Sequence, residues 1–154
     1  MAATDTYALW ERHFGKPTTD EAVIAEYRRA GYSEPPVLDR DDSEKSVSDG
    51  DATVSIYHPA SFGREDEFGD GVGLVAGVAL HVRRAGRDAF AGPLPFDIQR
   101  DFTRKALWKA LGEPDESDDD ELWDVWMIDD KEVIVSFSKG FKQIETVAVF
   151  LPDD

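Results

Sequence analysis

Apolar side chains in the first 30 residues recur at the spacing of two short helices. Residues 7–15 gather apolar and aromatic side chains on one side, behind Asp5 or Thr6 as a possible cap, and stop at Gly15. Residues 21–30 follow a capping segment at 18–20 and end in basic residues, which suit a helix C-terminus. The pattern predicts two consecutive amphipathic helices.

The hydrophobic period then changes from helical to strand-like. Residues 52–58 alternate with period two, and residues 72–82 form a valine-rich run typical of a strand buried on both faces. Gly73 and Gly77 inside that run indicate a bulge or a close backbone contact. We expect residues 32–51 to be a loop apart from a short strand at Val37 and Leu38, and residues 61–71 to be an acidic loop.

The second half of the chain follows a similar order after a turn-rich connection at residues 83–95. Ile98 or Asp101 opens a predicted helix that runs to Leu111 and ends at Gly112. Residues 115–121 are expected to form a solvated acidic loop. Residues 122–128, 132–138 and 143–151 then predict three strands in a hairpin meander.

These elements predict an α+β protein with an antiparallel β-meander sheet and helices packed on one face, folded as a single domain over residues 1–154. A weak internal similarity also favours a tandem pseudo-repeat. Leu9-Trp10, followed by Gly15-Lys16-Pro17, has a counterpart in Leu107-Trp108, followed by Gly112-Glu113-Pro114. The sub-repeats would span residues 5–83 and 96–152. A chance match of so short a pattern is the alternative.

Charge restricts the possible partners. The 154 residues include 33 acidic and 17 basic side chains, a net charge of −16, and no cysteine, which excludes disulfides and thiolate zinc sites. Such a chain repels nucleic acid and anionic membranes, so we expect a cationic partner protein. The first six residues show no signal-peptide pattern, and no apolar run is long enough to span a bilayer, so a cytoplasmic location is expected.

The sequence gives little support for catalysis. His13, His58 and His81 lack metal-ligand spacing. Residues 71–76 match the letters of a dinucleotide-binding motif but lead into β-branched residues rather than a helix, and the acidic loops lack the spacing of a calcium-binding loop. We therefore expect no enzyme, no cofactor and no metal. A metal-dependent hydrolase would instead require several carboxylates and a histidine to converge in one pocket.

An acidic stretch at residues 113–130, without one Lys or Arg, carries two tryptophans. Trp123 and Trp126 are an odd number of positions apart, so in a strand they point to opposite faces, and one can anchor the core while the other is exposed. Carboxylates beside an exposed aromatic ring are typical of a steered protein interface. The candidate partner-binding residues are Asp115, Glu116, Asp118, Asp119, Asp120, Glu121, Trp123, Asp124 and Trp126. A solvated loop beside core tryptophans is the alternative.

Three short motifs resemble a family of small bacterial proteins that includes the immunity proteins of S-type pyocins and related toxins. The motifs are Leu94-Pro95-Phe96, Thr103-Arg104 and Leu111-Gly112-Glu113-Pro114, and the ending at residues 147–152 is similar to that group's last strand. The resemblance covers about the last 60 residues. It implies a cognate toxin that is neutralised in the cytoplasm by a direct stoichiometric complex, and it transfers no binding residues.

Charge and resemblance together predict an immunity protein that binds a toxin with a cationic cleft, such as a nuclease, by imitating a phosphate array. Residues 39–51 and 65–70 are secondary acidic surfaces of this prediction. The alternative function is an acidic adaptor or structural domain without a toxin partner.

Overall fold

The computed structural model describes residues 4–152. It contains a seven-stranded antiparallel sheet in the order β1-β2-β3-β9-β8-β7-β6, with a separate two-stranded hairpin. The large sheet consists of β1 (Glu44–Asp49), β2 (Ala52–Tyr57), β3 (Leu74–His81), β6 (Glu116–Asp118), β7 (Trp123–Ile128), β8 (Lys131–Phe137) and β9 (Ile144–Phe150). The hairpin consists of β4 (Arg83–Arg84) and β5 (Arg87–Asp88).

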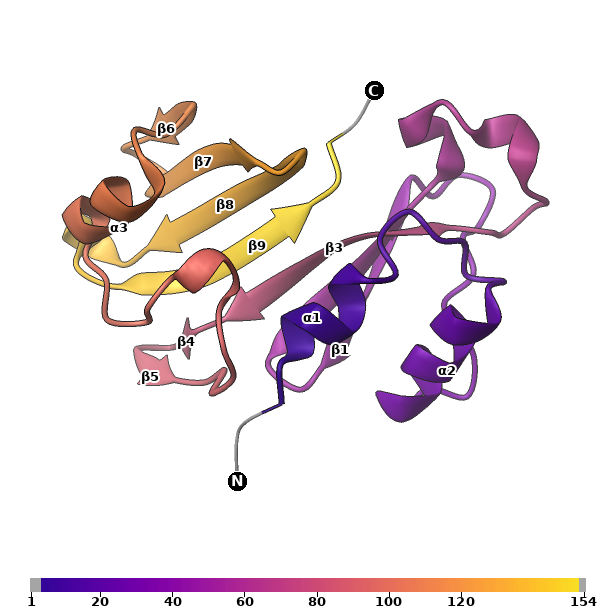
Figure 1. Cartoon of the computed structure of the whole chain (residues 1–154). Helices are drawn as coiled ribbons and strands as arrows, with labels where there is room; N and C mark the ends of the chain where they lie inside the picture. The colour runs from indigo at the N-terminus through magenta and orange to yellow at the C-terminus, as the bar shows by residue number, and fades with distance from the viewer. Residues whose placement is uncertain (1–3, 153–154) are drawn as a thin grey trace.

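Three α-helices and four 3-10 turns complete the described chain. The helices are α1 (Thr6–Glu11), α2 (Glu21–Arg29) and α3 (Arg104–Leu111), and the 3-10 turns are η1 (Pro59–Phe62), η2 (Glu65–Glu67), η3 (Pro95–Asp97) and η4 (Lys139–Phe141). Figure 1 shows α1 and α3 lying over the same face of the sheet. The predicted fold class, an antiparallel meander with helices on one face, is confirmed.

The two halves of the chain share one order of elements. In the first half, helices α1 and α2 precede the meander β1-β2-β3, and in the second half α3 precedes the meander β7-β8-β9. The last strands of the two meanders, β3 and β9, pair antiparallel at the centre of the sheet. The halves coincide with the predicted sub-repeats, and their common origin stays a prediction.

Side-chain caps fix where the helices begin. The Asp5 carboxylate accepts a hydrogen bond from the N–H of Ala8 at the start of α1, and Asp20 and Thr103 cap α2 and α3 in the same way. Helix α1 ends at Glu11, before the predicted end at Gly15. Helix α3 begins at Arg104, later than the predicted Ile98 or Asp101, because Thr103 has an extended backbone and is the N-cap.

Two edge strands were not predicted from the sequence. Strand β1 lies within the segment expected to be a loop, whereas Val37 and Leu38, expected to form a strand, do not. Strand β6 occupies part of the expected acidic loop at residues 115–121. Both strands have polar or charged outward positions, and polar edges are how sheets avoid pairing with other chains. Because the two strands contain few hydrophobic residues, the pattern of hydrophobic positions does not predict them.

Two apolar clusters form the core on the helix-covered face. The first surrounds Trp10 and Tyr27, and the second surrounds Leu107 and Trp126. Tyr7, Phe14 and Leu94 pack against both clusters, so the two halves share one continuous core. Residues 74–78 of β3 are all buried, so the prediction of a strand covered on both faces is confirmed for this part of residues 72–82, whereas Ala79 and His81 are half-buried.

Gly77 in β3 and Gly73 just before this strand both make close contacts at the backbone, as predicted. A Cβ at Gly77 would overlap the ring of Phe150, and a Cβ at Gly73 would lie 2.7 Å from Cδ1 of Ile56. The β2–β3 register also shifts between Ser55 and Ile56, where Gly77 pairs with Ser55. The bulge and the missing side chain together let Phe150 lie across the centre of the sheet.

Candidate functional site

Side chains on alternate strand positions divide the sheet into two faces. The pair Trp126 and Val133 faces the helices and belongs to the core, whereas the neighbouring pair Val125 and Ile134 faces away from them. We call the side that faces away from the helices the open face. It comprises residues 44, 46 and 48 of β1, 53, 55 and 57 of β2, 74, 77, 79 and 81 of β3, 146, 148 and 150 of β9, 132, 134 and 136 of β8, 123, 125 and 127 of β7, and 116 and 118 of β6.

The open face has an apolar centre and an acidic margin. Its apolar and aromatic side chains are Tyr57, Leu74, Ala79, Trp123, Val125, Met127, Ile134, Ala148 and Phe150. Met127 is 50% exposed, one of two large hydrophobic side chains so exposed within residues 4–152. The face carries four carboxylates, on Glu44, Glu116, Asp118 and Glu132, and no Lys or Arg occupies an open-face position in the strands.

A row of nearly parallel aromatic rings lies across one end of the open face. Tyr57 stacks on Phe62 with a centroid distance of 6.2 Å and on Phe150 with a distance of 6.1 Å, at interplanar angles of 15° and 21°. A hollow of about 420 Å³ lies beside this row, lined by Tyr57, Glu132, Ile134, Phe150, Leu151 and Pro152. A second hollow of about 250 Å³ is lined by Ser43, Glu44, Tyr57 and Ser61. Each hollow therefore combines an aromatic ring with one carboxylate.

The predicted acidic stretch borders the open face along β6. Pairing places Glu116 opposite Val125 and Asp118 opposite Trp123. Asp118 Oδ1 accepts hydrogen bonds from the N–H groups of Asp120 and Glu121, which shapes the turn that follows β6. Of the candidate partner-binding acids, those that remain exposed are Asp115, Glu116, Asp119, Asp120 and Glu121.

The two tryptophans of β7 point to opposite faces, as predicted. Trp123 lies on the open face and is partly exposed. Trp126 is only 2% exposed, belongs to the core, and donates a hydrogen bond from Nε1 to the carbonyl oxygen of Gly112 at 3.0 Å. Burial therefore removes Trp126 from the predicted contact surface.

Asp124 is likewise a structural residue. It is fully buried and accepts hydrogen bonds from both Nε and Nη2 of Arg104, from the indole N–H of Trp108 and from the hydroxyl of Ser117, at 2.7–2.9 Å. Burial acts to raise the pKa of Asp124, but the hydrogen bonds from these partners outweigh it and lower the pKa. This carboxylate is saturated inside the fold and is excluded from the predicted partner-binding set.

The first half contains a matching cluster that the sequence analysis missed. The indole N–H of Trp10 donates to Asp49 at 2.8 Å, and Arg29 donates to both oxygens of the same carboxylate. In both clusters the guanidinium also lies over the indole, at 5.8 Å for Arg29 on Trp10 and 4.8 Å for Arg104 on Trp108. The paired tryptophans were the available signal, but the carboxylates and arginines occupy different positions in the two halves.

A buried ionic cluster lies between α1 and α2. The carboxylate of Glu26 is 4% exposed and pairs with Arg12 and Arg29 at 2.7 Å and with His13 at 3.1 Å. Burial acts to raise the pKa of Glu26, but hydrogen bonds from Arg12, Arg29 and His13 outweigh it and lower the pKa. His13, a candidate metal ligand by residue type, is thus part of a structural cluster.

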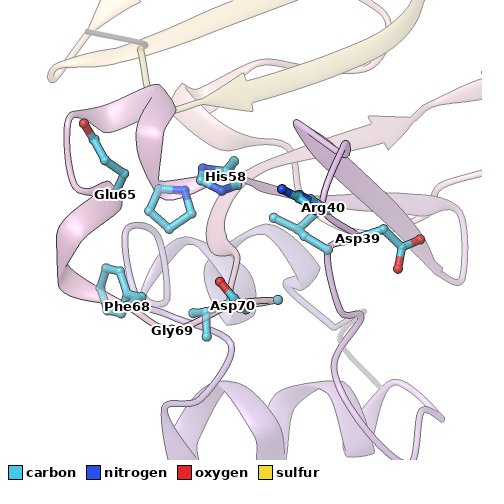
Figure 2. A pocket seen from close by; sticks show the side chains of 11 residues that line it. Asp39, Arg40, His58, Glu65, Phe68, Gly69 and Asp70 are labelled. Carbon is cyan, nitrogen blue, oxygen red and sulfur yellow. The ribbon is translucent and has the colours of Figure 1, made fainter.

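A hollow of about 450 Å³ lies at the end of the first meander (Figure 2). Figure 2 shows Arg40 and His58 on one side of it and Phe68 and Asp70 across the opening, while the carboxylate of Asp39 points away. His58 Nδ1 accepts a hydrogen bond from the N–H of Ala60, which caps η1. The charged side chains around this hollow are of mixed sign, with Arg40 among Asp39, Glu65 and Asp70.

The secondary acidic surfaces are also distributed over both sides of the fold. In residues 39–51, Asp39 and Asp42 lie 3.7 and 3.6 Å from Lys45, whereas Glu44 belongs to the open face. In residues 65–70, η2 is anchored by an ion pair between Glu67 and Arg64. Of these segments, only Glu44 joins the open-face margin.

Residues 4–152 contain no group of three or more His, Asp or Glu side chains placed to hold a metal ion. No helix in this range is both long and apolar enough to cross a membrane. Comparison of the chain with protein-family models, with curated proteins and with solved structures found no match.

Proposed function

We propose that this protein is an immunity protein, a non-catalytic inhibitor that binds a basic toxin enzyme through its open face and the adjoining acidic stretch. The observation that carries the proposal is the combination of an apolar centre, four carboxylates and no Lys or Arg at the open-face positions. The partner is a nuclease or another enzyme with a cationic cleft, and the complex forms in the cytoplasm with one copy of each protein.

Charge and packing have separate tasks in this proposal. The net charge of −16 attracts a basic protein and speeds its diffusional encounter, and this effect weakens as salt rises. The partly exposed rings of Tyr57, Trp123 and Phe150 offer the desolvated centre that slows dissociation. The exposed acids of the stretch, Asp115, Glu116, Asp119, Asp120 and Glu121, form the polar rim.

The test begins with the product of the gene next to the one that encodes this chain. We expect its expression to stop growth of a host cell, co-expression of this protein to restore growth, and the two purified proteins to form a one-to-one complex. Absence of both rescue and complex formation would contradict an immunity function and leave an acidic adaptor or structural domain as the better description.

Association kinetics then locate the interface. Changing Asp118, Asp119 and Asp120 together to Asn should slow association about three- to tenfold at low salt and flatten its salt dependence. The matched control changes Glu34 to Gln and both Asp97 and Asp101 to Asn, which removes the same charge from exposed positions outside the open face, the acidic stretch and the secondary acidic surfaces. Equal slowing by both triple variants would mean that only total charge matters and would remove the acidic stretch from the interface.

A further inference from the structure

The larger hollow on the open face is lined by residues of β2, β8 and β9, and β3 lies between β2 and β9 in the sheet. The rings of Tyr57 and Phe150 and the side chain of Ile134 line it, with Leu151 and Pro152 at its end. Phe150 lies across Gly77, where any Cβ would overlap its ring, so the glycine leaves the space that the ring occupies. The hollow therefore combines aromatic and aliphatic side chains with a lining that is mostly polar.

One carboxylate completes this hollow. The β8–β9 register places Glu132 directly opposite Phe150, and side chains in directly opposite positions have Cβ atoms about 5 Å apart. Within residues 4–152 the Glu132 carboxylate has no hydrogen bond or ion pair, and no Lys or Arg lines the hollow. This contrasts with Asp124 and Glu26, whose charges are matched inside the fold.

An unmatched carboxylate beside two aromatic rings favours one kind of ligand. An arginine guanidinium is planar, stacks on aromatic faces, and donates paired hydrogen bonds to a carboxylate. Its long aliphatic stem can also pack against the apolar side chains of the lining, such as Ile134 and Leu151. A free anion would be repelled by Glu132, and a purely apolar side chain would leave that carboxylate buried without a partner.

We propose that this hollow, which we call the arginine socket (Tyr57, Glu132, Ile134 and Phe150), receives an arginine side chain of the partner protein. The guanidinium lies over the aromatic row and pairs with Glu132. The inference rests on the proposed function, because an arginine at this position belongs to a protein docked on the open face. The socket would add a contact that determines specificity. Among the partner residues that dock at this end of the sheet, removal of this arginine should weaken the complex most.

The test uses the full chain and a small probe, so it does not depend on having the toxin. Nα-acetyl-argininamide is titrated into the labelled protein while NMR signals of Ile134, Phe150 and Tyr57 are followed. Nα-acetyl-citrullinamide, which has nearly the same shape without the charge, is the matched ligand control. We expect saturable shifts at the socket with the arginine probe and at least fivefold weaker binding of the citrulline probe.

Two variants identify the carboxylate. Glu132→Gln should weaken binding of the arginine probe about fivefold, the effect of losing one partly exposed charge pair. Glu116→Gln, which removes a charge elsewhere on the same face, should change it less than twofold. Both residues have no side-chain partner to lose, so neither variant threatens folding.

Three results would overturn the socket: shifts spread evenly over the acidic surface, equal binding of the two probes, or equal effects of the two variants. Failure of the proposed function is a separate outcome, since probe binding at the socket can occur while the neighbouring gene product is not neutralised. Neutralisation with full affinity by the Glu132→Gln variant would conversely leave the immunity function standing and reject the socket.

Discussion

The two faces of the sheet treat their carboxylates in opposite ways. On the helix-covered side, Asp124 and Asp49 are fixed by an arginine and a tryptophan each. On the open face, Glu116 and Glu132 have no side-chain partner within residues 4–152. A buried charge is tolerated only when it is paired and hydrogen-bonded, whereas an open-face charge can be satisfied by water or by a partner. The difference separates acids that hold the fold from acids that are available for recognition.

The largest expected contrast comes from the two tryptophans of β7. Trp126→Ala should lower the free energy of unfolding by about 3–5 kcal/mol, because it opens a cavity in the core and removes the hydrogen bond to Gly112. Trp123→Ala should lower it by less than half as much, since Trp123 is partly exposed. Urea unfolding followed by circular dichroism measures both, and equal losses would contradict the division into two faces.

Asp124→Asn should be next in size. The substitution leaves the Arg104 guanidinium without its buried counter-charge, and removal of one member of such a pair costs about 3 kcal/mol. Asp119→Asn is the control, because Asp119 contacts the same guanidinium but is 78% exposed, and it should change stability by less than about 0.5 kcal/mol. If the Asp124→Asn variant had an unchanged free energy of unfolding, this charge pair would not be what holds α3 on the sheet.

Gly77 tests the packing beneath the aromatic row. Gly77→Ala should destabilise the protein by about 1–3 kcal/mol, because its Cβ forces the ring of Phe150 to move. Gly69→Ala meets nothing within 4 Å and should be neutral or slightly stabilising. Thermal melts compare the two variants. The same Gly77→Ala protein should also lose binding of the arginine probe, since the socket wall is displaced.

Low pH should lower the free energy of unfolding mainly through the carboxylates on the helix-covered side, and less through those on the open face. The pKa values of Asp124 and Glu26 are lowered in the folded protein, so their stabilisation is present above their unfolded pKa values, near 4, and is lost as pH falls through the folded values. The free energy of unfolding that is lost at low pH should be smaller than the loss in a double variant that combines Asp124→Asn with Glu26→Gln. Urea midpoints between about pH 6 and 2.5 measure it, and the Asp124→Asn variant should show a shallower decline. An identical slope in that variant would contradict the assignment.

Much of the fold could be predicted because its signals are local. The caps at Asp5, Asp20 and Thr103 and the period-two runs of β2, β7, β8 and β9 depend on residues a few positions apart. The edge strands β1 and β6 could not be found in this way. Their polar sequences form strands only because neighbouring strands supply hydrogen-bond partners.

The candidate site was predicted in part. The position of the acidic stretch and the opposite orientations of Trp123 and Trp126 follow from the strand period. The burial of Asp124 does not, because it depends on Arg104 and Trp108 reaching it from a helix about 16–20 residues earlier in the chain. The sequence does not predict the arginine socket at all, because Tyr57, Glu132 and Phe150 are brought together only by the pairing of the strands in the sheet.

The sequence by itself determined the class of fold, the excess of negative charge and the helical or extended state of most segments, because these depend on composition and short-range periodicity. Only the tertiary structure decided which acidic side chains pair with partners inside the fold and which remain on an exposed surface. Hydrogen-bond partners are chosen by the distances that folding creates, and no spacing along the chain encodes the pairing of β3 with β9 that joins the two halves and brings the aromatic row together.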